Sequence, residues 1–180
     1  MHDIIIMALR EEAPDLAHRP DIFFSGIGKV NAAALTSRLI QQYRPQRIIN
    51  MGTAGGITVG TGLWRVTRFV QRDMQCVKLG CQPGATPFES TPVVLDLGGN
   101  GLTCSTGDNF VTDPDLEIPA DLVDMEAYAI AKVCWQQGVT FECYKWVTDQ
   151  ANADASQDWS VMMSSGQSHY IACLDKLGIR

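Results

Sequence analysis

Short apolar runs constrain the fold of this chain more than any other feature. Residues 4–7 read Ile-Ile-Ile-Met without a polar interruption, a second apolar run occupies 22–24, and 48–51 is a third predicted strand. A half-exposed strand alternates apolar and polar residues, whereas a continuous apolar run indicates a strand that is buried on both faces. Such strands belong to sheets that are covered by helices on both sides.

Amphipathic segments stand between the predicted strands. Helices are predicted where apolar residues recur at helical spacing, at 29–43, 126–137 and about 156–177, with Gly178 as the last C-cap. Further strands are predicted at 63–70, 93–97, 102–105 and 141–147. Strands that alternate with helices indicate an α/β fold with a largely parallel or mixed sheet.

The segment between these elements is rich in turn-forming residues. Residues 71–92 contain several prolines and are predicted to be irregular. Gly98-Gly99-Asn100-Gly101 is a strong hairpin or turn signal between strands 93–97 and 102–105. A length of 180 residues, without an internal repeat or linker, predicts one domain over residues 1–180.

Charge and hydropathy exclude several partners. The net charge is −6 and the chain has no run of lysine and arginine, which argues against nucleic acid and anionic membranes. No apolar stretch approaches the roughly 20 residues that span a bilayer. The start, Met-His-Asp followed by Ile4–Ile6, lacks the basic and long apolar regions of a signal peptide. We therefore expect a cytoplasmic protein.

The six cysteines do not form a recognisable metal-binding pattern. None belongs to a Cys-x-x-Cys pair, and Cys76 and Cys81 have no histidine nearby. Free cysteine is commonly buried, so we interpret these residues as reduced and mostly part of the core. Neither a metal nor a cofactor is predicted.

Ligands of open α/β sheets bind beyond the carboxyl ends of the strands. That rule selects six loops of this chain: 8–12, 25–28, 52–56, 105–111, 124–126 and 148–152. Each has an ordinary structural interpretation as well as a functional one. The glycines of 25–28 and 52–56 suit tight turns, Phe110 suits a core, and Asp149 suits a turn.

The loop at 124–126 carries the strongest single indication of a site. Asp124 and Glu126 stand where a helix begins, and acids there usually only cap the helix. Met125 lies between them. An apolar thioether beside a carboxylate offers a flat face and two acceptor lone pairs, which suits a sugar ring with two hydroxyls.

Taken together, the loops resemble a known family. The blocks run in order: Ala-Leu-x-Glu-Glu at 8–12, Ser-Gly-Ile-Gly-Lys-Val at 25–30, Gly-Thr-Ala-Gly-Gly at 52–56, Ser-x-Gly-Asp-x-Phe at 105–110, Asp-Met-Glu-Ala at 124–127 and Thr-Asp-x-Ala at 148–151. This order resembles the nucleoside phosphorylase/nucleosidase superfamily, and most closely the 5′-methylthioadenosine/S-adenosylhomocysteine nucleosidases. The resemblance covers about residues 4–152 and implies a three-layer sandwich, a mixed sheet flanked by helices.

The resemblance implies cleavage of an N-glycosidic bond to a purine, and it assigns the residues roles. Glu12 matches the residue that activates water, and Asp149 matches the acid that protonates the purine at N7. Met125 and Glu126 match contacts to the ribose. Thr53 matches the hydroxyl near the ribose and the nucleophile, while Phe110 and Val111 match the base pocket. Two carboxyl groups fit this chemistry, because positive charge develops on the sugar and negative charge on the purine.

Three functions remain open at this point. Glu11 and Glu12 would repel phosphate, which favours hydrolysis, but Arg10 would favour a purine nucleoside phosphorylase if it pointed into the site. A non-catalytic nucleoside-binding relative is the third possibility. Asp149 favours a 6-amino purine by family analogy, so the first choice is a nucleosidase acting on a 5′-modified adenosine.

The chain departs from the family pattern in two places. The segment between Pro14 and Ile22 is short, and residues 71–101 omit an expected helix. The region near 64–74 normally helps to enclose the 5′ substituent and to build a dimer, so the 5′ group stays unassigned. By resemblance, the expected partner is a small purine nucleoside, and the expected assembly is a homodimer.

Overall fold

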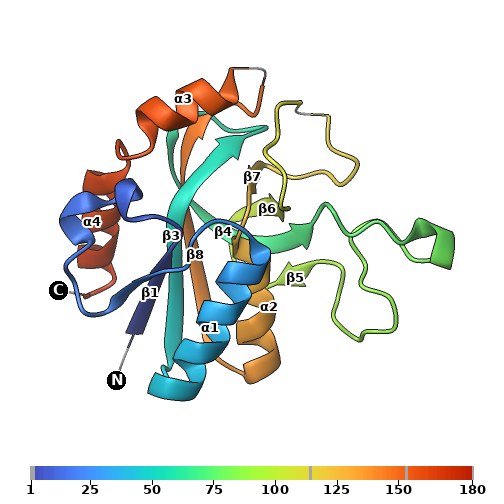
Figure 1. Cartoon of the computed structure of the whole chain (residues 1–180), viewed down its shortest axis with the longest axis horizontal. Coiled ribbons are helices and arrows are strands. Elements are labelled where there is room, and N and C mark those ends of the chain that lie inside the picture. Colours follow the sequence, from blue (N-terminus) through green and yellow to red (C-terminus); the bar gives the residue numbers. More distant parts are fainter. Residues whose placement is uncertain (1–2, 114, 153, 180) are drawn as a thin grey trace.

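The expected three-layer α/β sandwich is present in the computed structural model, which describes residues 3–113, 115–152 and 154–179. Figure 1 shows α1 (Lys29–Tyr43) and α2 (Ala127–Gln137) on one face of a mixed sheet, and α4 (Gln167–Lys176) on the other. The helix α3 (Ala155–Met162) lies beyond the ends of β3 and β8. Met1 and His2, part of the argument against a signal peptide, lie outside the described residues.

Eight strands form the sheet. They are β1 (Asp3–Met7), β2 (Ile22–Phe24), β3 (Arg47–Gly56), β4 (Gly62–Gln71), β5 (Leu95–Asp96), β6 (Leu102–Thr106), β7 (Leu122–Asp124) and β8 (Thr140–Asp149). Their order is β2-β1-β3-β7-β6-β4-β5, and β8 pairs with both β3 and β4. Strand β3 pairs with β8 along most of its length and with β7 at Gly55 and Gly56. Strands β3, β8, β4, β6 and β7 therefore form a closed ring.

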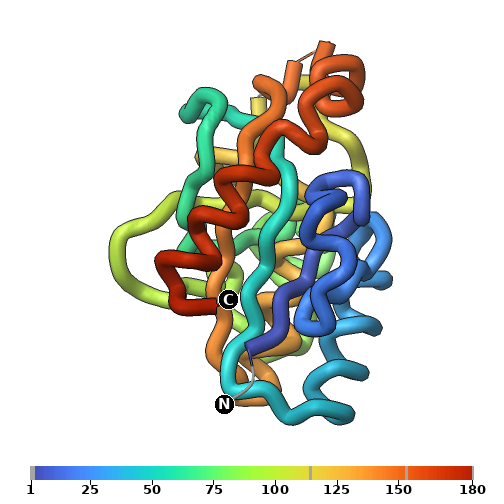
Figure 2. Tube along the Cα trace, turned by 90° about the vertical axis from the view of Figure 1, so that its left-hand side faces the viewer, coloured from blue at the N-terminus to red at the C-terminus, as the bar shows by residue number. Residues whose placement is uncertain are grey.

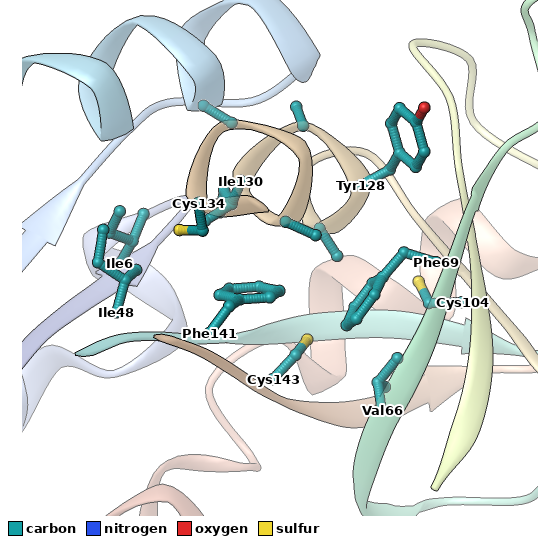
Figure 3. Packing of buried hydrophobic residues seen from close by; sticks show 14 of the residues in the cluster. Ile6, Ile48, Val66, Phe69, Cys104, Tyr128, Ile130, Cys134, Phe141 and Cys143 are labelled. Atoms are coloured by element: carbon teal, nitrogen blue, oxygen red, sulfur yellow. The ribbon is translucent and has the colours of Figure 1, made fainter. Parts of the chain in front are cut away.

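Alternation along the strands builds two separate cores. Ile4, Ile6 and Ile48 belong to the core that also contains residues of α1 and α2. Figure 3 shows Ile6 and Ile48 on the same side of the sheet as Phe141 and as Ile130 of α2. The intervening side chains, including Ile5, Met7 and Ile49, pack on the opposite face with Tyr170 and Leu174 of α4. Because successive side chains of a strand point to opposite faces, the apolar run at 4–7 fills both cores.

Two predicted features of the sheet were wrong in detail. The glycine-rich segment 52–56 is the last half of β3, and a register shift between Ala54 and Gly55 bends the strand there. Gly98–Gly101 forms a turn but does not close a hairpin, because β5 and β6 lie on opposite sides of β4. The three-residue β7 was not predicted.

The predicted final helix at 156–177 is two helices, α3 and α4. The chain changes direction between them, and Gly166 precedes α4. A Cβ at Gly166 would lie 2.5 Å from the indole of Trp146, so the close approach of α4 to the sheet requires glycine there. Hydrophobic periodicity runs through both helices and did not reveal this break.

Residues 72–94 contain one short helical turn, η3 (Val77–Leu79), in agreement with the irregular prediction. Figures 1 and 2 show this segment, drawn in green, extending away from the sheet. Within the described residues, no helix has the length and apolar character required to cross a membrane.

Candidate active site

One cavity brings together all seven predicted site residues. Its lining includes Glu12, Thr53, Phe110, Val111, Met125, Glu126 and Asp149. These residues come from the helical turn η1 (Arg10–Glu12), β3, the loop after β6, the start of α2 and the end of β8. Segments that are more than 130 residues apart in sequence therefore meet at one end of the sheet, as the topology rule predicts.

Glu12 is buried, and four donors surround its carboxylate. One oxygen, Oε2, accepts hydrogen bonds from the backbone N–H groups of Ala8 (3.1 Å) and Leu9 (3.0 Å). The other, Oε1, accepts from the backbone N–H (2.7 Å) and the hydroxyl (2.9 Å) of Thr53. These bonds compensate for the loss of water around a side chain that is 2% exposed.

Thr53 connects Glu12 to an aromatic side chain that sequence analysis did not assign to the site. The indole N–H of Trp159 donates to Thr53 Oγ1 across 3.0 Å. Trp159 also lines the cavity, and its ring meets Phe110 edge-on with centroids 6.3 Å apart. Helical periodicity placed Trp159 on the apolar face of the last helix, and the sequence contains no signal for its contact with a residue 106 positions away.

Asp149 lies at the end of β8, where backbone and side-chain donors hold it. Oδ1 accepts from the N–H of Ala151 (2.9 Å), and Oδ2 accepts from the Thr148 hydroxyl (2.8 Å). Burial raises the pKa of this carboxyl, although both hydrogen bonds oppose the rise. Asp149 therefore caps its own turn, as expected of an aspartate in such a position, and it also lines the cavity.

Glycines of β3 make room for both carboxyl groups. A Cβ at Gly52 would lie 3.1 Å from Glu12, and a Cβ at Gly55 would lie 2.8 Å from Asp149. Three residues of strand, a rise of roughly 10 Å, separate the two glycines. The two acids therefore approach β3 at different points along the strand.

Glu126 and Asp124 occupy different environments, although both stand near the start of α2. Asp124 ends β7, and its carboxylate accepts from the Ala127 N–H at 2.8 Å, so it caps the helix as expected for such an acid. Glu126 does not cap the helix with its side chain. Its Oε1 instead accepts from the N–H of Gly28 at 2.9 Å, in the turn before α1.

The two carboxyl groups also differ in protonation. Burial raises the pKa of Glu126 to about 7, and the negative charge of Asp124 adds to the rise. Burial would raise the pKa of Asp124 too, but the ammonium group of Lys145, 2.8 Å away, and the hydrogen bonds from Thr106 and Ala127 together outweigh burial and hold that pKa below its usual value. Lys145 is fully buried and was not predicted from the sequence.

Arg72 holds the loop that carries Phe110. Its guanidinium donates to the carbonyls of Ser105 (2.5 Å), Gly107 (3.1 Å), Asn109 (2.6 Å) and Asp124 (2.9 Å). The neighbouring Asp73 accepts from the N–H of Asp108 at 2.8 Å, and it pairs with Lys29 of α1. The end of β4 thereby sets the shape of the loop at 107–110.

Arg10, which left a phosphate site open in the sequence analysis, lies on the surface. Its side chain donates to the carbonyl of Ala17 at 3.1 Å and lies over the ring of Phe24, 4.7 Å from the centroid. Arg10 is not part of the cavity lining, whereas Arg72 is. The two Nη groups of Arg72 donate to backbone carbonyls, whereas its buried Nε has no hydrogen-bond partner among the described residues.

The chain is similar in sequence to known nucleosidases. The model of the phosphorylase superfamily matches residues 15–96. The 5′-methylthioadenosine/S-adenosylhomocysteine nucleosidase of Shewanella loihica is 33% identical over 170 residues, which cover 79% of this chain and 74% of that protein. The enzyme of the same name from Haemophilus influenzae (strain PittEE) is 34% identical over 160 residues, covering 73% of this chain and 69% of that protein.

Solved structures share the fold. A mutant methylthioadenosine nucleosidase of Helicobacter pylori, with 5′-methylthioadenosine in its active site, superimposes with a TM-score of 0.84 at 18% identity, covering 92% of this chain and 93% of that chain. The S-adenosylhomocysteine nucleosidase of Streptococcus pyogenes, in complex with 5-methylthiotubericidin, gives 0.81 at 22% identity, covering 96% and 94%.

Proposed function

Since the chain belongs to the 5′-methylthioadenosine/S-adenosylhomocysteine nucleosidase family, we propose that it hydrolyses the N-glycosidic bond of a 5′-modified adenosine, releasing free adenine and the sugar. The observation that carries the proposal is the meeting of Glu12, Glu126 and Asp149 in one cavity. Each of these carboxyl groups has a distinct environment. Carboxyl groups in different environments take different roles in bond cleavage.

Asp149 is the acid of this reaction. As the bond between C1′ and the purine N9 breaks, its electron pair moves into the purine, and Asp149 gives a proton to N7. A carboxylic acid that is protonated close to neutral pH suits this role, and burial shifts the pKa of Asp149 in that direction.

Glu12 is the base. A water molecule adds its oxygen to C1′, and its proton is removed on the side of Glu12, so that water supplies the hydroxyl of the sugar product. The carboxylate is held rigidly by its four hydrogen bonds, so it needs little reorganisation when the reaction begins.

The remaining residues bind the nucleoside. Glu126 accepts hydrogen bonds from the 2′ and 3′ hydroxyls of the ribose, and Met125 packs against the sugar. Phe110 stacks on the adenine, and the backbone of Val111 hydrogen-bonds its edge. Arg72 supports the base pocket by holding the loop before Phe110.

A phosphorylase requires cations beside the phosphate, and the described part of the cavity lining offers Arg72 alone, whose bonds go to carbonyls. The test is a panel of purine nucleosides with and without inorganic phosphate, followed by the release of free base. Release of adenine at the same rate in both conditions supports hydrolysis. Release that requires phosphate identifies a phosphorylase, and binding without release identifies a non-catalytic relative.

We also propose a homodimer in the cytoplasm. Segment 77–97 carries five exposed apolar side chains, Val77, Leu79, Phe88, Val94 and Leu97, which a second copy of the chain would cover. All six cysteines are unpaired thiols, as in a reducing compartment. Light scattering tests the assembly against the 19.7 kDa mass of one chain.

A further inference from the structure

The hydrogen bonds of Glu12 bear on how it receives a proton. An ionised carboxylate has about four lone-pair positions, two on each oxygen. Ala8 and Leu9 fill those of Oε2, and the N–H and hydroxyl of Thr53 fill those of Oε1. A water molecule in the cavity therefore meets a base whose acceptor positions are already occupied.

Among these four donors, the Thr53 hydroxyl differs from the other three. The backbone N–H groups hold protons that do not transfer at neutral pH. A hydroxyl, by contrast, is both a donor and an acceptor with two lone pairs. One lone pair of Thr53 Oγ1 accepts from Trp159, its proton goes to Glu12, and one lone pair remains.

We propose that the proton of the attacking water reaches Glu12 through the hydroxyl of Thr53, which the indole N–H of Trp159 holds in position. The inference rests on the function proposed above and goes beyond it by adding a relay and a positioning residue. Thr53 touches the water, whereas Trp159 acts through Thr53.

The relay balances without another reactant. The oxygen of water bonds to C1′ while its O–H bond breaks, and that proton moves to Thr53 Oγ1. The original hydroxyl proton of Thr53 moves to Glu12 Oε1 across the existing 2.9 Å hydrogen bond. Thr53 ends as it began, with one proton, and Glu12 becomes a neutral acid that later releases its proton to solvent.

Trp159 favours this transfer for a simple electrostatic reason. Its N–H is a donor only, so it can contact Thr53 Oγ1 only through an oxygen lone pair. This contact directs the hydroxyl proton toward Glu12. It also stabilises the negative charge that grows on Oγ1 as the proton leaves.

The first test compares Thr53→Val with Thr53→Ser in the full chain, with 5′-methylthioadenosine as substrate. Valine keeps the shape but removes the hydroxyl, so we expect kcat to fall by about 10²-fold, a usual contribution of general-base proton transfer, while KM changes less than threefold. Serine keeps the hydroxyl and should restore kcat to within about tenfold of wild type. If Glu12 takes the proton directly, Thr53→Val frees a lone pair and keeps wild-type kcat, which overturns the relay.

The second test removes one hydrogen bond. Trp159→Phe keeps an aromatic ring but lacks the N–H, and we expect kcat to fall by about three- to tenfold, the worth of one hydrogen bond. The matched control is Trp64→Phe, because the Trp64 indole donates a bond of the same 3.0 Å length to Gly60, outside the cavity. This control should retain wild-type kcat.

The double variant separates positioning from packing. If Trp159 acts through Thr53, adding Trp159→Phe to Thr53→Val should not lower kcat further. A full additional loss would show that Trp159 supports the site by packing alone. Glu12→Gln is measured in parallel with wild type. Failure of wild type to release adenine from 5′-methylthioadenosine would refute the proposed function itself. A fully active Glu12→Gln would refute Glu12 as the base and the relay with it, whereas an inactive Glu12→Gln beside a fully active Thr53→Val would refute only the relay.

Discussion

Lys145 and Asp124 form an ion pair of 2.8 Å beneath the cavity, and each side chain is only 1% exposed. Asp124 also accepts from the hydroxyl of Thr106 (2.5 Å) and the N–H of Ala127 (2.8 Å). Burial opposes the charge on Lys145, but the acidic groups around it, Asp124 foremost, together outweigh that effect and raise the pKa of the ammonium group well above its usual value. The pair therefore stays charged and joins β8 to β7.

Breaking this pair should be costly. Lys145→Met leaves the charge of Asp124 buried without its partner, so we expect the free energy of unfolding in urea to fall by about 3–5 kcal/mol. Lys145→Met combined with Asp124→Leu removes both charges and should recover part of that loss. A single variant as stable as wild type would contradict the structure of the pair.

Replacing either of the two acids proposed for catalysis should lower activity without disturbing the fold. Glu12→Gln and Asp149→Asn each remove one proton-transfer group, so we expect kcat to fall by about 10²–10⁴-fold with an unchanged circular dichroism spectrum. Glu11→Gln is the control, since Glu11 is the exposed neighbour of Glu12. Wild-type turnover in both variants would reject the assignment.

Glu126 should make stability depend on pH. Its pKa is about 7 in the folded chain against an ordinary value of 4.5, so the folded state binds this proton more tightly than the unfolded state. The contribution of Glu126 to the free energy of unfolding should therefore be complete below pH 4.5 and should be lost as the pH rises from 4.5 through 7. The total loss should be at most roughly 3 kcal/mol. Urea titrations at several pH values measure this slope. Glu126→Gln should flatten it, and an equal slope in that variant would contradict the prediction.

Gly55 should be required for the position of Asp149. In Gly55→Ala the new Cβ would stand 2.8 Å from Asp149 Oδ1 and 3.0 Å from Val123, so the acid has to move. We expect kcat to fall at least about tenfold, because a small misplacement of a catalytic group is expensive. Gly60→Ala is the matched control, as a Cβ at Gly60 meets nothing within 4 Å. Equal activity of the two variants would argue against the proposed role of Asp149.

Arg72 should affect substrate binding more than turnover. Arg72→Lys keeps the charge but cannot reach four diverging carbonyls, so the loop before Phe110 loosens and KM should rise about tenfold, or 1.4 kcal/mol. Arg68→Lys serves as control, because Arg68 also bonds a backbone carbonyl, that of Gly101, away from the cavity. A fall in kcat with constant KM would assign Arg72 a different role.

The sequence alone predicted the architecture and the residues that gather in the cavity. The run at 4–7 indicated a sheet covered on both faces, and the carboxyl ends of the strands selected the loops that line the cavity. The resemblance to the nucleosidases then singled out Glu12 and Asp149 within those loops. The first two inferences depend on local pattern and on the general geometry of α/β sheets, which a sequence displays directly.

Only the tertiary structure revealed what surrounds those groups. Trp159 contacts Thr53 across 106 residues, Lys145 neutralises Asp124, and Arg72 holds a loop through backbone carbonyls. No repeating pattern in the sequence marks such contacts, because the distance along the chain between the two partners depends on the path of the whole fold. The pKa of Glu126 follows from the same cause: burial and the neighbouring charge of Asp124 exist only after the chain has packed.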